Sequence, residues 1–150
     1  MKLLSIAFAI LFASFSSFAL AIDGLIAVKS PNSVAVTMDK LETFVKDRGL
    51  KVFARIDHAA GAATIGKTLR PTEVLIFGNP QGGTPFMECA QTIGIDLPLK
   101  VLVWEDASDQ VWLDYNDPAY LAQRHGVSQC PIVEKLSKTL SSLAEATVAP

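Results

Sequence analysis

The chain has 150 residues with 13 Lys and Arg against 15 Asp and Glu, which gives a formal net charge of −2 at pH 7. Non-specific binding of nucleic acid depends on Lys and Arg that neutralise phosphates, so an acidic chain without basic clusters is not expected to bind nucleic acid. The length is typical of one domain with a single hydrophobic core.

The first 21 residues have the pattern of a cleaved export signal. Lys2 supplies a positive charge, an apolar run follows from Leu3 to Phe18, and Ala19-Leu20-Ala21 places small residues where a signal peptidase cuts. The alternative is a retained membrane anchor, but a run of about 16 residues with four serines is shorter than the roughly 20 apolar residues of a membrane helix.

We therefore predict a signal peptide over residues 1–21 and one mature domain over residues 22–150. The mature chain is expected to be exported, to the periplasm or the exterior, with no stable membrane insertion after cleavage. Because Lys2 is the one charged residue removed, 12 basic and 15 acidic side chains remain and the formal charge is about −3.

Two cysteines remain in the mature chain, Cys89 and Cys130. An oxidising compartment would allow them to pair, closing a loop of about 42 residues with a stabilisation of roughly 4 kcal/mol in the chain-entropy model. Each cysteine also suits a packed thiol, so the sequence leaves the pairing open. The spacing of Cys and His matches no metal motif, and we predict no metal site and no cofactor.

In chain order, the mature domain begins with a short strand over residues 26–29 and cap residues 30–33. A helix is predicted over about residues 34–48, and Gly49 supplies its left-handed stop. The apolar side chains of this helix recur at helical spacing and form one face for packing on a sheet: Val34, Met38, Leu41 and Val45.

The middle of the chain predicts two strands and two short helices. Residues 51–57 alternate, with Val52, Ala54 and Ile56 on one face and Phe53, Arg55 and Asp57 on the other. An Ala/Gly-rich stretch over residues 59–66 is compatible with a short helix. Residues 72–77 read as an apolar strand ended by a turn at Gly78-Asn79-Pro80, and Thr84-Pro85 predicts the cap and first residue of a helix reaching about Thr92.

The last part of the chain predicts a hairpin and two helices. Residues 99–105 and 110–115 are strand-like and are joined by a four-residue polar loop. Asp117 caps a helix from Pro118 to near His125, and a final helix is expected over residues 131–146. The resulting order of elements predicts an α+β fold, with a mainly antiparallel sheet and helices packed on one face.

Four runs of the chain resemble the DUF302 family of small domains of unknown function: RIDHAAGA (Arg55 to Ala62), PTEVLIFGNP (Pro71 to Pro80), DLPLKVLVWED (Asp96 to Asp106) and YNDPAYLAQRH (Tyr115 to His125). The resemblance runs from about Lys29 to Val127. The elements predicted above follow a β-α-β4-α-like order with helical insertions, and to this the resemblance adds a sheet curved around its helices, as in TATA-box-binding-protein-like folds, and a homodimer. Since the family has no assigned reaction, the resemblance implies an architecture and no activity.

Eight polar residues lie within or beside the apolar segments of these runs: Arg55, Asp57, His58, Glu73, Asn79, Asp96, Glu105 and Asp106. The first five of them form the candidate site. The first hypothesis is a non-catalytic dimeric module that binds a small molecule between sheet and helices, with these residues as polar contacts. The alternative is a hydrolase or isomerase that uses His58 with Asp57 or Glu73 as acid and base.

Each candidate residue also has a structural explanation. Arg55 and Glu73 are placed to pair across adjacent strands, a contact of roughly 0.2–1 kcal/mol if exposed. Asp57 is placed to cap the segment that follows it. The chain contains no GxSxG, phosphate-loop or GxGxxG motif, which favours the binding hypothesis over the enzyme. The position of the His58 imidazole also distinguishes the two hypotheses. An imidazole that points into a pocket within hydrogen-bond reach of Glu73 or His125 would favour the enzyme.

Overall fold

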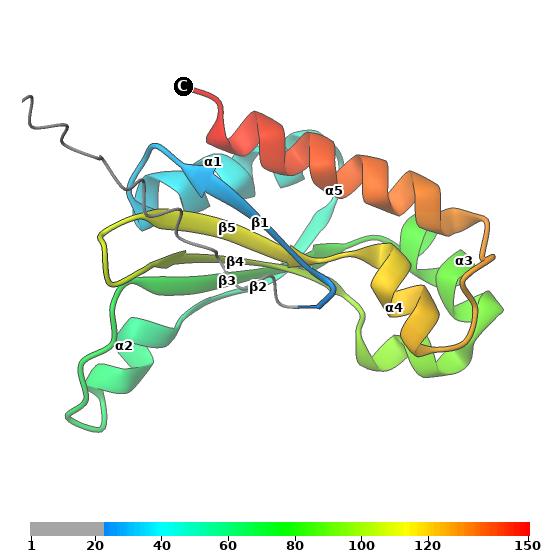
Figure 1. The fold of residues 1–150 in the computed structure, drawn as a ribbon, viewed down its shortest axis with the longest axis horizontal. Helices are drawn as coiled ribbons and strands as arrows, with labels where there is room; N and C mark the ends of the chain where they lie inside the picture. Colours follow the sequence, from blue (N-terminus) through cyan, green and yellow to red (C-terminus); the bar gives the residue numbers. More distant parts are fainter. Residues whose placement is uncertain (1–22) are drawn as a thin grey trace, which may run out of the picture.

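The computed structural model describes residues 23–150, which form a five-stranded antiparallel sheet with helices on one face and at both ends (Figure 1). The predicted signal peptide lies outside the described residues. In chain order the elements are β1 (Leu25–Ser30), α1 (Val34–Asp47), β2 (Lys51–Asp57), α2 (His58–Ala63), β3 (Thr72–Gly78), α3 (Pro80–Cys89), the 3₁₀ helix η1 (Gln91–Ile95), β4 (Leu99–Glu105), β5 (Val111–Asn116), α4 (Pro118–Arg124) and α5 (Ile132–Val148). The predicted α+β class is confirmed.

The strands follow the order β1-β5-β4-β3-β2, and each pair of neighbours is antiparallel. The strand at the N-terminal end of the described chain thus pairs with β5, the last strand in the sequence. α1 and α5 cover one face of the sheet (Figure 1). Within residues 23–150, no helix is both long enough and apolar enough to cross a membrane.

The main core lies between α1, α5 and the covered sheet face. The predicted apolar face of α1 is entirely buried there, against alternate residues of the central strands. The buried contributors from β3, β4 and β5 include Leu75, Phe77, Val101, Val103, Leu113 and Tyr115, and α5 adds Leu140 and Leu143.

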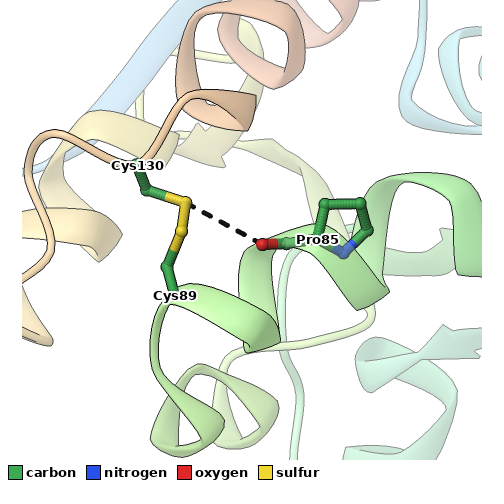
Figure 2. The surroundings of a disulfide bond; sticks show 3 residues. All are labelled: Pro85, Cys89 and Cys130. Atoms are coloured by element: carbon green, nitrogen blue, oxygen red, sulfur yellow. Dashed lines mark hydrogen bonds between the residues drawn. A yellow bond between two sulfur atoms is a disulfide. The ribbon is translucent and has the colours of Figure 1, made fainter.

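A second core cluster joins α3, η1, α4 and the start of α5 at one end of the sheet; its buried members include Phe86, Ile93 and Leu121. A disulfide between Cys89 and Cys130 closes this cluster, with 6.0 Å between the two Cα atoms (Figure 2). The bond ties the last residue of α3 to the segment just before α5.

The alternation predicted for β2 is interrupted by a β-bulge between Val52 and Ala54. Val52 lies opposite Phe77 and packs against the core, whereas Ala54 lies opposite Ile76, on the other face. The prediction that Val52 shares a face with Ala54 and Ile56 is therefore wrong, because the inserted residue reverses the facing of the strand.

The prediction of a helix from Pro85 to Thr92 is also wrong. α3 starts five residues earlier, where Asn79 is the N-cap and Pro80 follows at the first position, and Pro85 lies inside the helix. Asn79 therefore caps a helix and is not part of a turn that only ends β3. Cys89 is the last residue of the same helix. The chain offers the same cap-then-proline pattern twice, and the first copy starts the helix.

Candidate functional site

A cavity of about 470 Å³ opens between the start of α3 and the first half of α5, at the end of β3. Its volume falls within the range of about 300–1,000 Å³ that is usual for small-molecule sites. Most of the lining is apolar, and the principal apolar side chains are Leu50, Phe53, Phe77, Met87, Leu97, Leu99, Ile132 and Leu136.

Two local features of the sequence shape this cavity. Phe53, which lines it, occupies the β-bulge of β2. Asn79 begins α3 by accepting a hydrogen bond from the Gly82 backbone N–H at 2.9 Å, so that the first turn of α3 faces the cavity. A Cβ atom on Gly82 would lie only 3.3 Å from Leu136 Cδ2, so glycine allows α3 to approach α5 closely.

The polar part of the lining is small. It consists of backbone around Gly82 and of the side chains of Asn79, Gln81, Thr84, Lys135 and Thr139. Among the lining residues within 23–150, Lys135 is the one charged residue, and none carries a carboxylate or an imidazole. This lining suits the burial of an apolar molecule.

Among the predicted site residues, Asn79 lines the cavity, whereas Arg55, Asp57, His58 and Glu73 do not. Arg55 is the centre of an ion-pair network. Its Nε donates to Glu73 Oε2 at 2.6 Å, and its Nη1 donates to Asp39 at 2.6 Å and to Glu42 at 3.4 Å. These bonds, first that to Glu73, raise the pKa of Arg55 above its ordinary value. Arg55 therefore ties β2 and β3 to α1.

Asp57 and His58 lie at the junction of β2 and α2. The Asp57 carboxylate caps α2 by accepting a hydrogen bond from the Ala60 backbone N–H at 2.8 Å. His58 is exposed as the first residue of α2, and none of residues 23–150 forms a hydrogen bond with its ring. Since Glu73 is engaged by Arg55, the structure does not assemble His58, Asp57 and Glu73 into an acid–base site.

His125 belongs to a cluster that the sequence did not reveal. Its Nε2 lies 2.7 Å from Asp96 Oδ2 and its Nδ1 lies 2.8 Å from Thr92 Oγ1, while Arg124 donates to Asp96 at 3.0 Å. His125 follows α4, at the opposite end of the sheet from α2 and His58 (Figure 1). The cluster lies outside the cavity lining and joins η1 to α4.

Among residues 23–150, no helix covers the second face of the sheet, which displays aromatic and aliphatic side chains. Trp104 lies opposite Trp112 across β4 and β5, and Lys29 places its ammonium group 5.3 Å from the centre of the Trp112 ring. The Trp112 indole N–H donates to Asp106 at 2.8 Å, and this bond is the main cause of the lowered Asp106 pKa.

Asp114 lies on the same open face and is only 3% exposed. Its Oδ2 accepts a hydrogen bond from Trp104 Nε1 at 2.6 Å, whereas its Oδ1 is buried and forms no hydrogen bond with any of residues 23–150. Burial raises the pKa of this carboxyl above its ordinary value. Within residues 23–150, no three His, Cys, Asp or Glu side chains gather as a metal site.

The fold and the cavity describe a small α+β domain whose interior could hold an apolar molecule. The family model described as "Domain of unknown function DUF302" matches residues 26–145. The chain belongs to the DUF302 family. The crystal structure of an uncharacterized conserved DUF302 protein from Bacillus stearothermophilus superposes with a TM-score of 0.76 at 18% identity, covering 84% of this chain and 99% of that one.

Curated relatives share a long segment with this chain. "Fluoride-specific ion channel FluC 1" of Brucella suis biovar 1 (strain 1330) is 53% identical over 104 residues, which is 69% of this chain and 41% of the relative. "Fluoride-specific ion channel FluC 1" of Brucella abortus biovar 1 (strain 9-941) matches equally, over 38% of its length. The chain thus spans about two fifths of the length of these relatives.

Proposed function

We propose that this protein is an exported, dimeric, non-catalytic module that binds a small apolar molecule in the cavity between α3 and α5. The observation that carries the proposal is the cavity itself, with its volume of about 470 Å³ and its largely aliphatic and aromatic lining. A pocket of this size and composition is the usual form of a small-ligand site. Asn79 is the one residue of the five predicted from the sequence that enters this proposal.

The arrangement of the remaining candidate residues favours binding over catalysis. Glu73 is held by Arg55 at 2.6 Å and Asp57 caps α2, so neither carboxylate is available to orient His58. A general base needs its proton donor within hydrogen-bond reach, directly or through one water. The hydrolase or isomerase alternative would therefore require a rearrangement around His58.

The open face of the sheet is the surface we propose for the dimer. It carries Trp104, Trp112 and Leu102, and Ile56 at its edge is 41% exposed. Aromatic residues are enriched at protein interfaces, and an uncovered apolar sheet face is typical of an interaction surface. The DUF302 resemblance, which implies a homodimer, supports the same arrangement.

The name "Fluoride-specific ion channel" describes whole relatives of which the chain spans about two fifths. We therefore infer that the 104 shared residues are a module that occurs both in this chain and in longer proteins, and we assign no fluoride conduction to this chain.

Thermal-shift screening of the mature protein against a metabolite panel tests the binding proposal. At least one apolar compound should raise the melting temperature, because a ligand that binds only the folded state stabilises it. Two variants fill the cavity from opposite walls, Thr139→Trp from α5 and Thr84→Trp from α3, and both should abolish the shift.

Thr43→Trp is the matched control for Thr139→Trp. Thr43 on α1 and Thr139 on α5 both donate their hydroxyl to the carbonyl four residues earlier, at 2.9 Å and 2.8 Å, but Thr43 is outside the cavity lining. Thr43→Trp and His58→Ala should respond to ligands as the parent protein does. Ligand responses that survive in both cavity-filling variants, or that disappear in His58→Ala, would refute the proposal.

A further inference from the structure

We propose that the ligand is an anionic amphiphile, with an apolar chain inside the α3–α5 cavity and a carboxylate head group at Lys135. This inference rests on the proposed function and specifies the chemical class of ligand for the same cavity.

The cavity lining is cationic although the chain is acidic. The whole chain has a formal net charge of −2, yet the lining residues within 23–150 include one cation, Lys135, and no anion. An anionic group at this position gains attraction without repulsion from another lining residue. A neutral or cationic head group would gain no comparable contact.

Lys135 has no ionic partner among residues 23–150. Its side chain is exposed, and no ion pair or side-chain hydrogen bond joins its ammonium group to any of residues 23–150. Its neighbour Lys138, by contrast, pairs with Glu134 at 2.6 Å on the same helix. The Lys135 ammonium group is therefore available to a ligand without loss of a protein contact.

A basic groove adjoins the cavity. This shallower groove shares Lys135 and Thr139 with the cavity, and its other lining residues include Arg48, Lys138 and Glu134. The groove lining thus contains three cationic side chains, those of Arg48, Lys135 and Lys138, and one carboxylate, that of Glu134. The apolar cavity and the basic groove meet at Lys135, which matches the division of an amphiphile into an apolar chain and an anionic head.

Isothermal titration calorimetry of the mature protein with decanoate, decanol and acetate at pH 7 tests this inference. Decanoate and decanol share the apolar chain, and acetate carries the head group alone. We expect decanoate to bind about two- to five-fold more tightly than decanol, as is usual for a solvent-accessible ion pair, and acetate to show no binding. The advantage of decanoate should shrink in about 1 M salt.

Lys135→Gln should remove the advantage of decanoate and leave decanol binding unchanged. Lys67→Gln is the control, because Lys67 is also exposed and lies in the loop after α2, at the other end of the sheet; it should retain the advantage. If decanoate and decanol bind the parent protein equally, the anionic head group is refuted while the binding proposal stands. If neither compound binds, both proposals fail.

Discussion

Arg55 shows how a residue that looks like a ligand contact can act as a structural tie. Its guanidinium bridges Glu73 on β3 and both Asp39 and Glu42 on α1. Glu42 is in turn paired with Lys46, and the bonds from Lys46 and Arg55 lower the Glu42 pKa. The network fastens α1 to the β2 edge of the sheet, and its members are not among the residues that line the cavity.

Replacement of Arg55 by Met keeps the aliphatic stem and removes these bonds. We expect a loss of about 1–2 kcal/mol in the free energy of unfolding, because the side chain is partly buried and its hydrogen bonds are charged. Arg70→Ala is the control, since Arg70 pairs with the highly exposed Asp109, and should cost less than about 0.5 kcal/mol. Urea unfolding measures both. Equal losses in the two variants would contradict the structural role of Arg55.

The buried Asp114 carboxyl should make the protein less stable as the pH rises. Burial raises its pKa in the folded protein, so the unfolded chain releases this proton at lower pH. The contribution of Asp114 to the free energy of unfolding therefore decreases as the pH rises from the ordinary Asp pKa of about 3.9 to the raised folded value, and stays low above it.

The Asn side chain in Asp114→Asn does not ionise, so the free energy of unfolding of this variant should lack the decrease with pH that Asp114 causes. The free energy of unfolding of the variant minus that of the parent should increase as the pH rises through this window, and urea unfolding between about pH 3 and pH 7 measures it. A difference that is constant, or that decreases with pH, would show that the folded protein does not disfavour the Asp114 carboxylate.

At the scale of elements, α3 illustrates what local patterns resolve and what they leave open. Asn79-Pro80 and Thr84-Pro85 both satisfy the preference for a cap followed by proline. The helix begins at the first pair, where α3 packs against α5. By contrast, the helical period of α1 and the β4–β5 hairpin were predicted closely, because one apolar face or one short loop specifies each.

The disulfide between α3 and the start of α5 should be a major source of stability. It links Cys89 to Cys130 across a sequence separation of 41 residues, and the chain-entropy model assigns about 4 kcal/mol to a loop of this length. Urea unfolding of a Cys89→Ala/Cys130→Ala double variant should show a loss of about 2–5 kcal/mol. The parent protein after reduction should behave in the same way, and a loss below about 1 kcal/mol in both would contradict the prediction.

At the scale of the whole molecule, the open sheet face predicts a dimer. The mature protein should have about twice the mass of one chain in light scattering coupled to size-exclusion chromatography. Leu102→Lys places a charge in the middle of this face and should yield monomers, whereas Leu69→Lys, in the exposed loop before β3, should not. A parent protein that is monomeric across micromolar concentrations would exclude the dimer.

The cavity, unlike the fold class, could not be predicted from the sequence. Its lining comes from separate segments around residues 50–53, 77–87, 94–99 and 132–139, and no local pattern encodes the space between them. The His125–Asp96 contact likewise spans 29 residues and depends on how η1 packs beside α4. Asn79 was predicted from its place in a family-like run, while its role as the cap of α3 emerged from the structure.

The central claim, that the α3–α5 cavity binds an apolar molecule, is tested most directly by fluorescence titration with the neutral apolar probe N-phenylnaphthylamine. We predict saturable binding to the parent protein and to Thr43→Trp, and binding at least about ten-fold weaker to Thr139→Trp, because the indole would occupy space needed by the probe. Equal affinity of the probe for Thr139→Trp and Thr43→Trp would contradict the claim.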